Sequence, residues 1–506
     1  MEVIINKSPF AVLQKLVRTS ICLGAFFLIA LFWVPVAVFA GNGMHNVQQG
    51  RSKKIKVSSL LALKKALKVA SPGTEIIIEN GVYQMDGDVE VGVFGTPQAP
   101  IKIHAQKTGQ VIFAGKGSWV LTSDAHHIIL SGFCFKNALL KAPSDYRAAL
   151  VVSAGTKDCR ITRNRFQLTG EGIDLMVAGA AHEIDHNLFC HKNSMGQMLA
   201  VRGSGKQVAT NLHIHHNYFY DFKDQGGRNG AEVLQFGLSG FSLSSSHSVV
   251  EYNLFENCHA EAELISVKAS EVTLRYNTIR SSKAQFTLRH GNRNEVYNNY
   301  FEKTPGLRIY GDDHHIFGNY FKDCTVGITI GNGDGEVADG AKLTCHDRPD
   351  RIYIGFNTLI NNDLGIMVQP RKQGLGATKV SVKDNIIVGG QKAVAILGEL
   401  KQGVWSGNLL SNNKQVGDLP SDSYKQFTMT RPSLIKLSSN GLYLPSKHGP
   451  LFNRTMDTLP NGRVPYFYTG MRSLRPHIGD RYSHYKVTKS TGLDYLRPKN
   501  VGIYAK

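Results

Sequence analysis

The sequence contains little cysteine for its length, seven residues in a chain of 506. Six of them follow Ala40, are widely spaced and form no CxxC pair: Cys134, Cys159, Cys190, Cys258, Cys324 and Cys345. This pattern disfavours both a small disulfide scaffold and a structural zinc site. With 42% hydrophobic and 19% charged residues, the composition is that of a globular protein, and we expect these thiols to be buried in a large core.

Acidic residues are also scarce, since 39 Asp and Glu stand against 58 Lys and Arg and give a formal net charge of +19. Such a charge favours a polyanionic partner, which could be nucleic acid, an anionic membrane surface or an acidic polysaccharide. The chain lacks an RNP-like aromatic motif, which argues against nucleic acid. The histidine-rich pieces HIHHN (213–217) and DDHHIF (312–317) offer no complete zinc ligand set, because adjacent residues of a strand face opposite ways.

A long apolar run, ICLGAFFLIALFWVPVAVFA, lies at the N-terminus behind several basic residues. It ends in Val38-Phe39-Ala40 before Gly41, which is a small-residue cleavage pattern. We therefore expect residues 1–40 to be a signal peptide and the mature chain to be periplasmic or secreted, with no membrane partner after cleavage. The alternative is an uncleaved membrane anchor, which would leave the rest of the chain on the same side.

The remainder of the chain repeats an Asn followed by a short apolar pair, as in RITRNRF, HIHHNYF and EVYNNYF. The repeated asparagines are Asn164, Asn187, Asn217, Asn253, Asn277, Asn299, Asn319, Asn357, Asn385 and Asn408. Their spacing gives a unit of roughly 20 to 24 residues with a few insertions, which is typical of a solenoid. We expect Asn at one fixed turn to form a hydrogen-bonded ladder from coil to coil, because turns that tolerate a left-handed backbone favour Asn.

No repeat unit contains a helix-length segment, so a leucine-rich horseshoe is disfavoured. The pattern predicts an all-β fold, a right-handed single-stranded parallel β-helix over residues 57–417, with each unit forming one coil. The segment SSLLALKKALKVA (58–70) has helical apolar spacing and is predicted to be an N-terminal capping helix. Residues 418–506 are basic, aromatic and rich in turn residues, and we expect an irregular C-terminal extension packed on the solenoid.

The stretch ENCHAEAELISVKAS, residues 256–270, carries charged residues in an otherwise apolar run. Residues two apart share one face of a strand, so Glu261 and Glu263 are predicted to point outward while Ala262 and Leu264 point into the core.

Lys268 precedes Arg289 by about one coil, and coils stack at roughly 4.8 Å, so these two side chains should lie near each other. Counting from the asparagine ladder places Asn229, Glu263, Arg289 and Arg308 of four successive coils on one patch of one face.

Two carboxylates and an amide oxygen are ligands that suit Ca²⁺. A cation bound to the carboxylate of a uronic-acid polymer would stabilise the charge that develops when the neighbouring carbon loses its hydrogen. Lys268 could take that hydrogen as a base, because nearby Ca²⁺ and Arg289 both disfavour its ammonium form. Arg289 could polarise the departing glycosidic oxygen, although its guanidinium is a poor proton donor without help from water.

Four blocks carry a resemblance to a known family: NGAE (229–232), EAELISVKAS (261–270), LRHGNR (288–293) and GLRIYGDDH (306–314). In order and spacing they resemble the signature blocks of polysaccharide lyase family 6, the family of chondroitinase B and alginate lyases. The similarity runs from the Ser58 helix to about Asn408.

The resemblance implies a parallel β-helix that cleaves uronate polymers by β-elimination with the help of Ca²⁺. By the same resemblance, the metal ligands are Asn229, Glu261 and Glu263. Lys268 is implied as the base and Arg289 as the acid. His290 and Arg308 are implied as substrate contacts.

Several functions stay open at the level of sequence. Alginate is expected as the substrate because alginate lyases are the commoner members of the family, and dermatan sulfate is the alternative. A glycoside hydrolase could use Glu261 and Glu263 as acid and base, since two residues of strand span about 6.6 Å, but it leaves Lys268 and Arg289 without a role. A non-catalytic carbohydrate-binding solenoid would also explain the charge and the export signal. The oligomeric state is left open.

Overall fold

The computed structural model describes residues 53–138, 147–426, 434–436, 443–445 and 498–504. The predicted signal peptide lies outside these residues, as does most of the predicted C-terminal extension. Among the described residues, no helix is long and apolar enough to cross a membrane.

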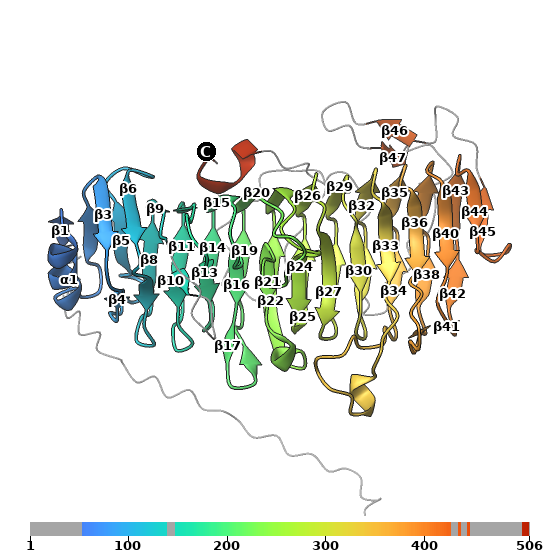
Figure 1. Ribbon diagram of the computed structural model, residues 1–506, viewed down its shortest axis with the longest axis horizontal. Helices are drawn as coiled ribbons and strands as arrows, with labels where there is room; N and C mark the ends of the chain where they lie inside the picture. Colours follow the sequence, from blue (N-terminus) through green and yellow to red (C-terminus); the bar gives the residue numbers. More distant parts are fainter. Residues whose placement is uncertain (1–52, 139–146, 427–433, 437–442, 446–497, 505–506) are drawn as a thin grey trace, which may run out of the picture. The chain divides into compact units, whose positions relative to one another are not determined.

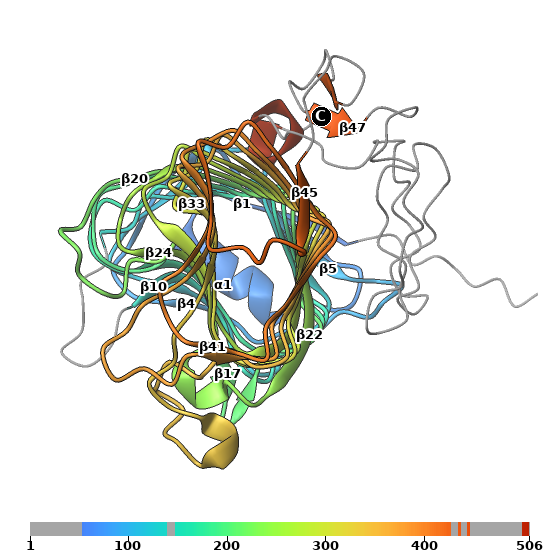
Figure 2. The same ribbon diagram turned by 90° about the vertical axis from the view of Figure 1, so that its right-hand side faces the viewer.

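Three long parallel sheets wind into a right-handed parallel β-helix, as predicted. Each coil contributes one strand to each sheet (Figure 1). We call the three sheets A, B and C, and along the chain each coil passes through sheet B, then sheet C, then sheet A. In Figure 2 the coils superimpose around a common interior.

Sheet A consists of β1 (Lys54–Val57), β2 (Glu75–Ile78), β5 (Ile101–Ala105), β8 (Ile128–Ser131), β11 (Arg160–Thr162), β14 (Glu183–Asp185), β19 (His213–His215), β22 (Ser245–Glu251), β25 (Ser270–Arg275), β28 (Glu295–Tyr297), β31 (His315–Phe317), β34 (Tyr353–Gly355), β38 (Ser381–Lys383) and β42 (Val404–Ser406). Sheet B consists of β3 (Gly81–Met85), β6 (Val111–Gly115), β9 (Phe133–Phe135), β12 (Arg165–Phe166), β15 (Leu188–Lys192), β20 (Tyr218–Phe222), β23 (Leu254–Cys258), β26 (Thr278–Arg280), β29 (Tyr300–Glu302), β32 (Tyr320–Lys322), β35 (Thr358–Ile360), β39 (Ile386–Val388), β43 (Asn408–Ser411) and β45 (Tyr424–Gln426). Sheet C consists of β4 (Val89–Val91), β7 (Trp119–Leu121), β10 (Ala148–Val152), β13 (Ile173–Val177), β16 (Leu199–Val201), β21 (Leu234–Phe236), β24 (Glu263–Lys268), β27 (Gln285–His290), β30 (Leu307–Ile309), β33 (Val326–Ile330), β36 (Leu364–Val368), β40 (Lys392–Ile396) and β44 (Gln415–Gly417).

Short elements complete the described part. They are the pairs β17 (Gly203–Ser204) with β18 (Gln207–Val208), β37 (Ala377–Thr378) with β41 (Leu400–Lys401) and β46 (Leu434–Lys436) with β47 (Tyr443–Pro445), and the 3-10 turns η1 (Ser239–Phe241), η2 (Val337–Asp339), η4 (Pro498–Asn500) and η5 (Gly502–Tyr504).

The predicted capping helix is α1 (Leu60–Lys68). Its first turn is closed by Ser59, whose hydroxyl accepts a hydrogen bond from the Ala62 amide at 3.1 Å. Leu63 and Leu67 lie one turn apart, and both are buried in the same core as the first coils. The helix therefore covers the apolar end of the solenoid with its own apolar face.

The asparagine ladder is present and continuous from Asn164 to Asn408. From Asn187 onward, each Oδ1 accepts the backbone amide of the ladder Asn one coil earlier, as Asn253 does from Asn217 at 2.9 Å; the Oδ1 of Asn164 accepts the amide of Phe133. The prediction that Asn occurs here because it adopts the left-handed backbone was wrong. The positive φ belongs to the residue before the ladder Asn, such as Tyr252 at 53°. The turn is buried, so a ladder residue needs a side chain that both donates and accepts hydrogen bonds, as the side-chain amide of Asn does.

The core is built from inward-facing side chains that stack at the coil repeat. Five phenylalanines of sheet B stack with ring centroids 4.6–4.9 Å apart: Phe135, Phe166, Phe189, Phe219 and Phe255. Five of the six described cysteines are buried free thiols, as expected, and Cys345 is half-buried. At the other end of the chain, Val501 packs against Leu188, Tyr218 and Leu254 on the outside of sheet B.

Several insertions interrupt the repeat, and two of them border sheet C. Residues 223–233 connect β20 to β21, and residues 331–352 connect β33 to β34. They lie within the two widest gaps in the asparagine spacing, Asn217 to Asn253 and Asn319 to Asn357, and the first gap also contains the connection of residues 237–244.

Candidate functional site

A cavity of about 280 Å³ lies on the outer face of sheet C, over β21, β24 and β27. Its lining consists of Asn229, Gly230, Glu232, Gln235, Glu261, Ala262, Glu263, Lys268, Arg289 and His346. Five of the seven site residues predicted from the sequence are in this lining. His290 and Arg308 are not, but both lie directly beside it.

A bulge in β24 sets which of its side chains face the cavity. Glu263 pairs with Gln285 and Ile265 with Phe286, so Leu264 is an extra residue between them. Leu264 is fully buried as predicted, whereas Ala262 is exposed and lines the cavity, which corrects the predicted inward orientation. Simple alternation fails here because Ala262 precedes β24 and lies in the bend that leads into the strand.

A second register shift separates Lys268 from its predicted neighbour. In the register of β24 against β27, Lys268 lies opposite His290, one residue beyond Arg289. Arg289 nevertheless lines the same cavity as Lys268. In the next coil Arg308 pairs with Thr287.

Carboxylates crowd one side of the cavity. Glu261 accepts the backbone amides of Gly230 at 2.8 Å and Ala231 at 3.3 Å, which ties the first insertion to the coil beside it. Burial and the negative charges of Glu232 and Glu263 together raise the pKa of Glu261 to about 8, against the effect of those two hydrogen bonds. Carboxylates that repel one another in this way are a suitable environment for a hard cation.

Glu232 is a cavity residue to which sequence reasoning assigned no role. Only 3% of it is exposed, and its Oε1 lies 3.4 Å from the Nζ of Lys268. Two amides fix its carboxylate, since Gln197 donates to Oε2 at 2.9 Å and Gln235 donates to Oε1. Glu232 belongs to the NGAE block that was detected in the sequence, but no sequence pattern indicated that residues 223–233 fold back over sheet C.

Glu263 links the carboxylates to the arginines. Its Oε1 lies 2.7 Å from Nη2 of Arg308 and 3.5 Å from Nε of Arg289, and its Oε2 accepts the Ser266 hydroxyl at 2.6 Å. Burial lowers the pKa of Arg289. Nη1 of Arg289 and Nε of Arg308 are buried and make no hydrogen bond with any described residue. Such unused charged donors can bind an anionic ligand.

Two histidines beside the cavity are held neutral. Burial lowers the pKa of His290 to about 3, with the positive charges of Arg289 and Lys268 acting in the same direction. Burial likewise lowers the pKa of His346 to about 4, together with Arg289 and Arg371. His346 was missed by sequence reasoning, which detected the insertion of residues 331–352 only as a long gap between asparagines.

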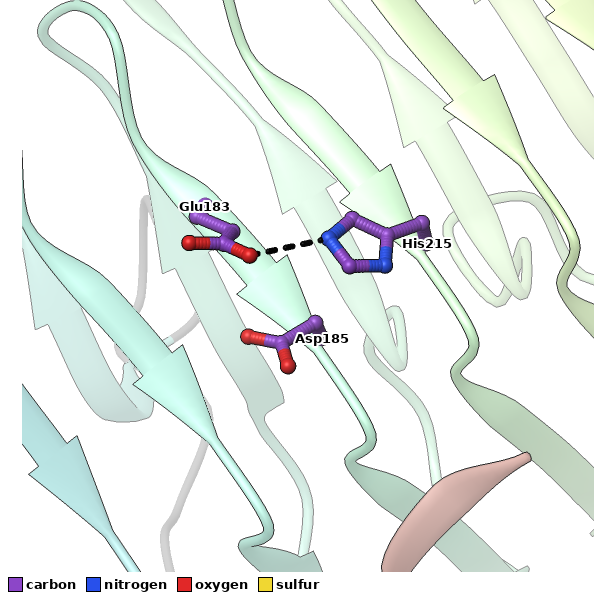
Figure 3. Close-up of side chains that lie close together, drawn as sticks. All are labelled: Glu183, Asp185 and His215. Carbon is purple, nitrogen blue, oxygen red and sulfur yellow. Dashed lines mark hydrogen bonds and ion pairs between the residues drawn. The ribbon is translucent and has the colours of Figure 1, made fainter. Parts of the chain in front are cut away.

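A separate cluster on sheet A brings Glu183, Asp185 and His215 together, with one potential ligand atom of each within 4.8 Å of the others (Figure 3). His215 belongs to the histidine-rich piece HIHHN, and its acidic neighbours Glu183 and Asp185 come from the adjacent coil. The guanidinium of Arg160 donates to both Asp185 oxygens at 2.8 and 2.7 Å, and His215 lies 3.1 Å from Glu183. Because Arg160 already neutralises the Asp185 carboxylate, we interpret the cluster as an ion-pair network.

Comparison with known proteins agrees with the fold. The sequence profile of the family described as Chondroitinase B matches residues 57–429. No curated protein matches the chain. The structure of a PL6 family alginate lyase, AlyGC, is 26% identical with a TM-score of 0.68 over 78% of this chain and 55% of that chain. This chain thus corresponds to about half the length of that lyase.

Two further structures share the fold. A mannuronic acid specific polysaccharide family 6 lyase from human gut microbiota is 22% identical with a TM-score of 0.63, over 75% of this chain and 92% of that chain. The alginate lyase AlyF-OU02, in complex with G6, is 21% identical with a TM-score of 0.64, over 79% of this chain and 92% of that chain. The family profile covers well over half of the sequence and the similar structures have the same β-helix, so the chain belongs to the chondroitinase B family, polysaccharide lyase family 6.

Proposed function

We propose that the chain is a Ca²⁺-assisted polysaccharide lyase that cleaves alginate by β-elimination and releases unsaturated oligosaccharides. The observation that carries the proposal is the cavity on sheet C, where Glu261 and Glu263 lie beside Lys268 and Arg289. Exposed ion pairs on a strand contribute little and carry no chemistry by themselves. This cavity differs because its carboxylates repel one another and its arginines keep unused donors.

The proposed metal ligands are Asn229, Glu261 and Glu263, which all line the cavity. Their donors are oxygens only, as Ca²⁺ prefers. When bound, Ca²⁺ would neutralise the substrate carboxylate and stabilise the enolate-like charge formed next to it.

Lys268 is the proposed base. It takes the hydrogen from the carbon beside the substrate carboxylate, the electron pair forms the new carbon–carbon double bond, and the bond to the glycosidic oxygen breaks. Glu232, 3.4 Å from Nζ, can pair with the ammonium that results. Arg289 stabilises the departing oxygen, which takes its proton with the help of water. Arg308 and His290 are proposed to contact the substrate, Arg308 through its unused Nε.

Alginate is proposed ahead of dermatan sulfate because alginate lyases are prominent among the similar structures. We further propose that residues 57–417 form the lyase domain, that 1–40 export it to the periplasm or medium, and that 418–506 extend it. Export is consistent with a polymer substrate that lies outside the cell.

The test is near-ultraviolet absorbance of the chain mixed with alginate or with dermatan sulfate, because elimination creates a conjugated double bond. Lys268→Ala should lower the rate by about 10²–10⁴-fold, the usual contribution of a general base. Lys283→Ala, an exposed lysine in the next coil, serves as the matched control and should leave the rate unchanged.

Other outcomes separate the alternatives. New reducing ends without absorbance would identify a glycoside hydrolase. Binding of either polymer without cleavage would identify a carbohydrate-binding solenoid. Absorbance with dermatan sulfate alone would keep the lyase and replace the substrate.

A further inference from the structure

A second group of carboxylates lies outside the cavity, where the insertion of residues 331–352 meets the turn between β30 and β31. Asp312 comes from the turn, and Glu336 and Asp347 come from the insertion. One oxygen of each lies within 4.8 Å of the other two. Asp312 is 6% exposed, Asp347 is 3% exposed and the Glu336 side chain is 10% exposed, so water has little access to any of them.

The surrounding groups leave part of this charge unsatisfied. Asp347 accepts the amide of Val337 at 2.8 Å, and Glu336 pairs with Arg348. Arg351 reaches Oδ2 of Asp312 at 3.3 Å. Oδ1 of Asp312 is buried and has no hydrogen-bond partner among the described residues.

Arg351 cannot fully neutralise Asp312, because it also pairs with Asp313 at 2.6 Å and with Asp350. A buried carboxylate oxygen without a partner is costly, and native proteins rarely contain one unless a ligand, ion or water satisfies it.

Two of the three carboxylates have raised pKa values. Burial and, to a smaller extent, the negative charge of Asp347 together raise the pKa of Asp312 to about 6, against the positive charge of Arg351. Burial also raises the pKa of Asp347, and Glu336 contributes in the same direction. Asp312 and Asp347 are therefore destabilised in their charged form by burial and by a neighbouring carboxylate.

We propose that Asp312, Glu336 and Asp347 bind a second Ca²⁺, separate from the ion proposed for the catalytic cavity. The potential ligands are carboxylate oxygens alone, with no nitrogen or sulfur donor that would favour zinc or another transition metal. Two of the three come from an irregular segment, which suits the variable geometry of Ca²⁺ better than the strict octahedron of Mg²⁺.

This ion would fix one wall of the catalytic cavity. His346 lines the cavity and is the residue immediately before Asp347. Its ring lies 4.8 Å from the ring of Tyr310, two residues before Asp312. Binding at the carboxylates would thus clamp the insertion to the solenoid on both sides of His346, which makes the site structural and leaves the chemistry to the cavity.

The experiment counts Ca²⁺ in a chain whose catalytic carboxylates have been removed. Glu261→Gln/Glu263→Gln, stripped with a chelator and titrated with Ca²⁺ by calorimetry, should still bind one ion per chain. Adding Asp347→Asn should weaken that binding on the order of 10-fold or more, because one ligand charge is lost. The Asn oxygen can still accept the Val337 amide, so the fold should be kept. Asp339→Asn, an exposed acid of the same insertion, is the control and should change nothing.

A second readout follows the insertion itself. In the same background, Ca²⁺ should slow proteolytic cleavage within residues 331–352, and Asp312→Asn, on the solenoid side, should abolish the protection. The proposal is overturned if the background variant binds no Ca²⁺, if neither Asp347→Asn nor Asp312→Asn weakens binding, or if Mg²⁺ binds as tightly as Ca²⁺. These outcomes do not depend on lyase activity.

Discussion

Removing one ladder asparagine should destabilise the solenoid far more than removing an exposed asparagine. In Asn253→Ala, the amide of Asn217 loses its acceptor at 2.9 Å and the carbonyl of Ile214 loses its donor at 2.9 Å. Ile214 and Asn217 are both fully buried, so water does not replace the lost bonds. At about 1–3 kcal/mol for each unsatisfied buried group, the free energy of unfolding should fall by about 2–6 kcal/mol.

The matched control is Asn80→Ala. Asn80 also accepts a backbone amide, that of Lys107 at 3.1 Å, but it is exposed, so water can replace the lost bond. Its substitution should cost less than about 1 kcal/mol. Urea unfolding measures the difference, and hydrogen exchange of the amides of β20 and β23 shows whether the loss is local. Equal effects of the two substitutions would refute the argument that the ladder stabilises the coils.

Three further predictions concern the metal and the buried charges. Chelation should abolish turnover and added Ca²⁺ should restore it; full activity in a metal-free preparation would contradict the proposed mechanism. Lys192→Met should cost about 3–5 kcal/mol in urea unfolding, because it leaves Asp174, its partner at 2.8 Å, buried without a counter-charge; Lys192→Met/Asp174→Leu should recover much of this loss. Acid should destabilise the fold through His182, whose pKa burial lowers to about 4 with a smaller contribution from His126. Its Nδ1 accepts the Cys159 amide at 3.1 Å, so the unfolded chain takes up the proton at a higher pH than the folded chain. About 3 kcal/mol of the free energy of unfolding should therefore be lost as the pH falls from about 6.5 to about 4. His182→Gln should remove that part of the pH dependence.

Much of the fold could be predicted because the repeat is local. An Asn at one fixed turn and alternating apolar residues on either side specify a coil within some 20 residues. The helix at 60–68 was predicted for the same reason, since its cap and its apolar spacing are adjacent in the chain. The residues Glu261, Glu263, Lys268 and Arg289 lie on two consecutive coils, so counting residues was enough to bring them to one face.

Only the tertiary structure decided the details that depend on strand register and on the insertions. The bulge at Leu264 arises from pairing with the next coil, and Ala262 is exposed because it lies in the bend before β24. Asn229 and Glu232 reach the cavity because residues 223–233 fold back over sheet C, and no periodicity specifies that path.

The same limit applies to the second insertion. His346 at the cavity wall and Asp347 beside Asp312 are separated from their partners by a long, non-repeating segment. The sequence by itself determined the coil and the face on which the chemistry lies, because both follow from local periodicity. The tertiary structure alone decided which insertion residues complete the cavity and the second carboxylate cluster, because those contacts join segments that no repeat relates.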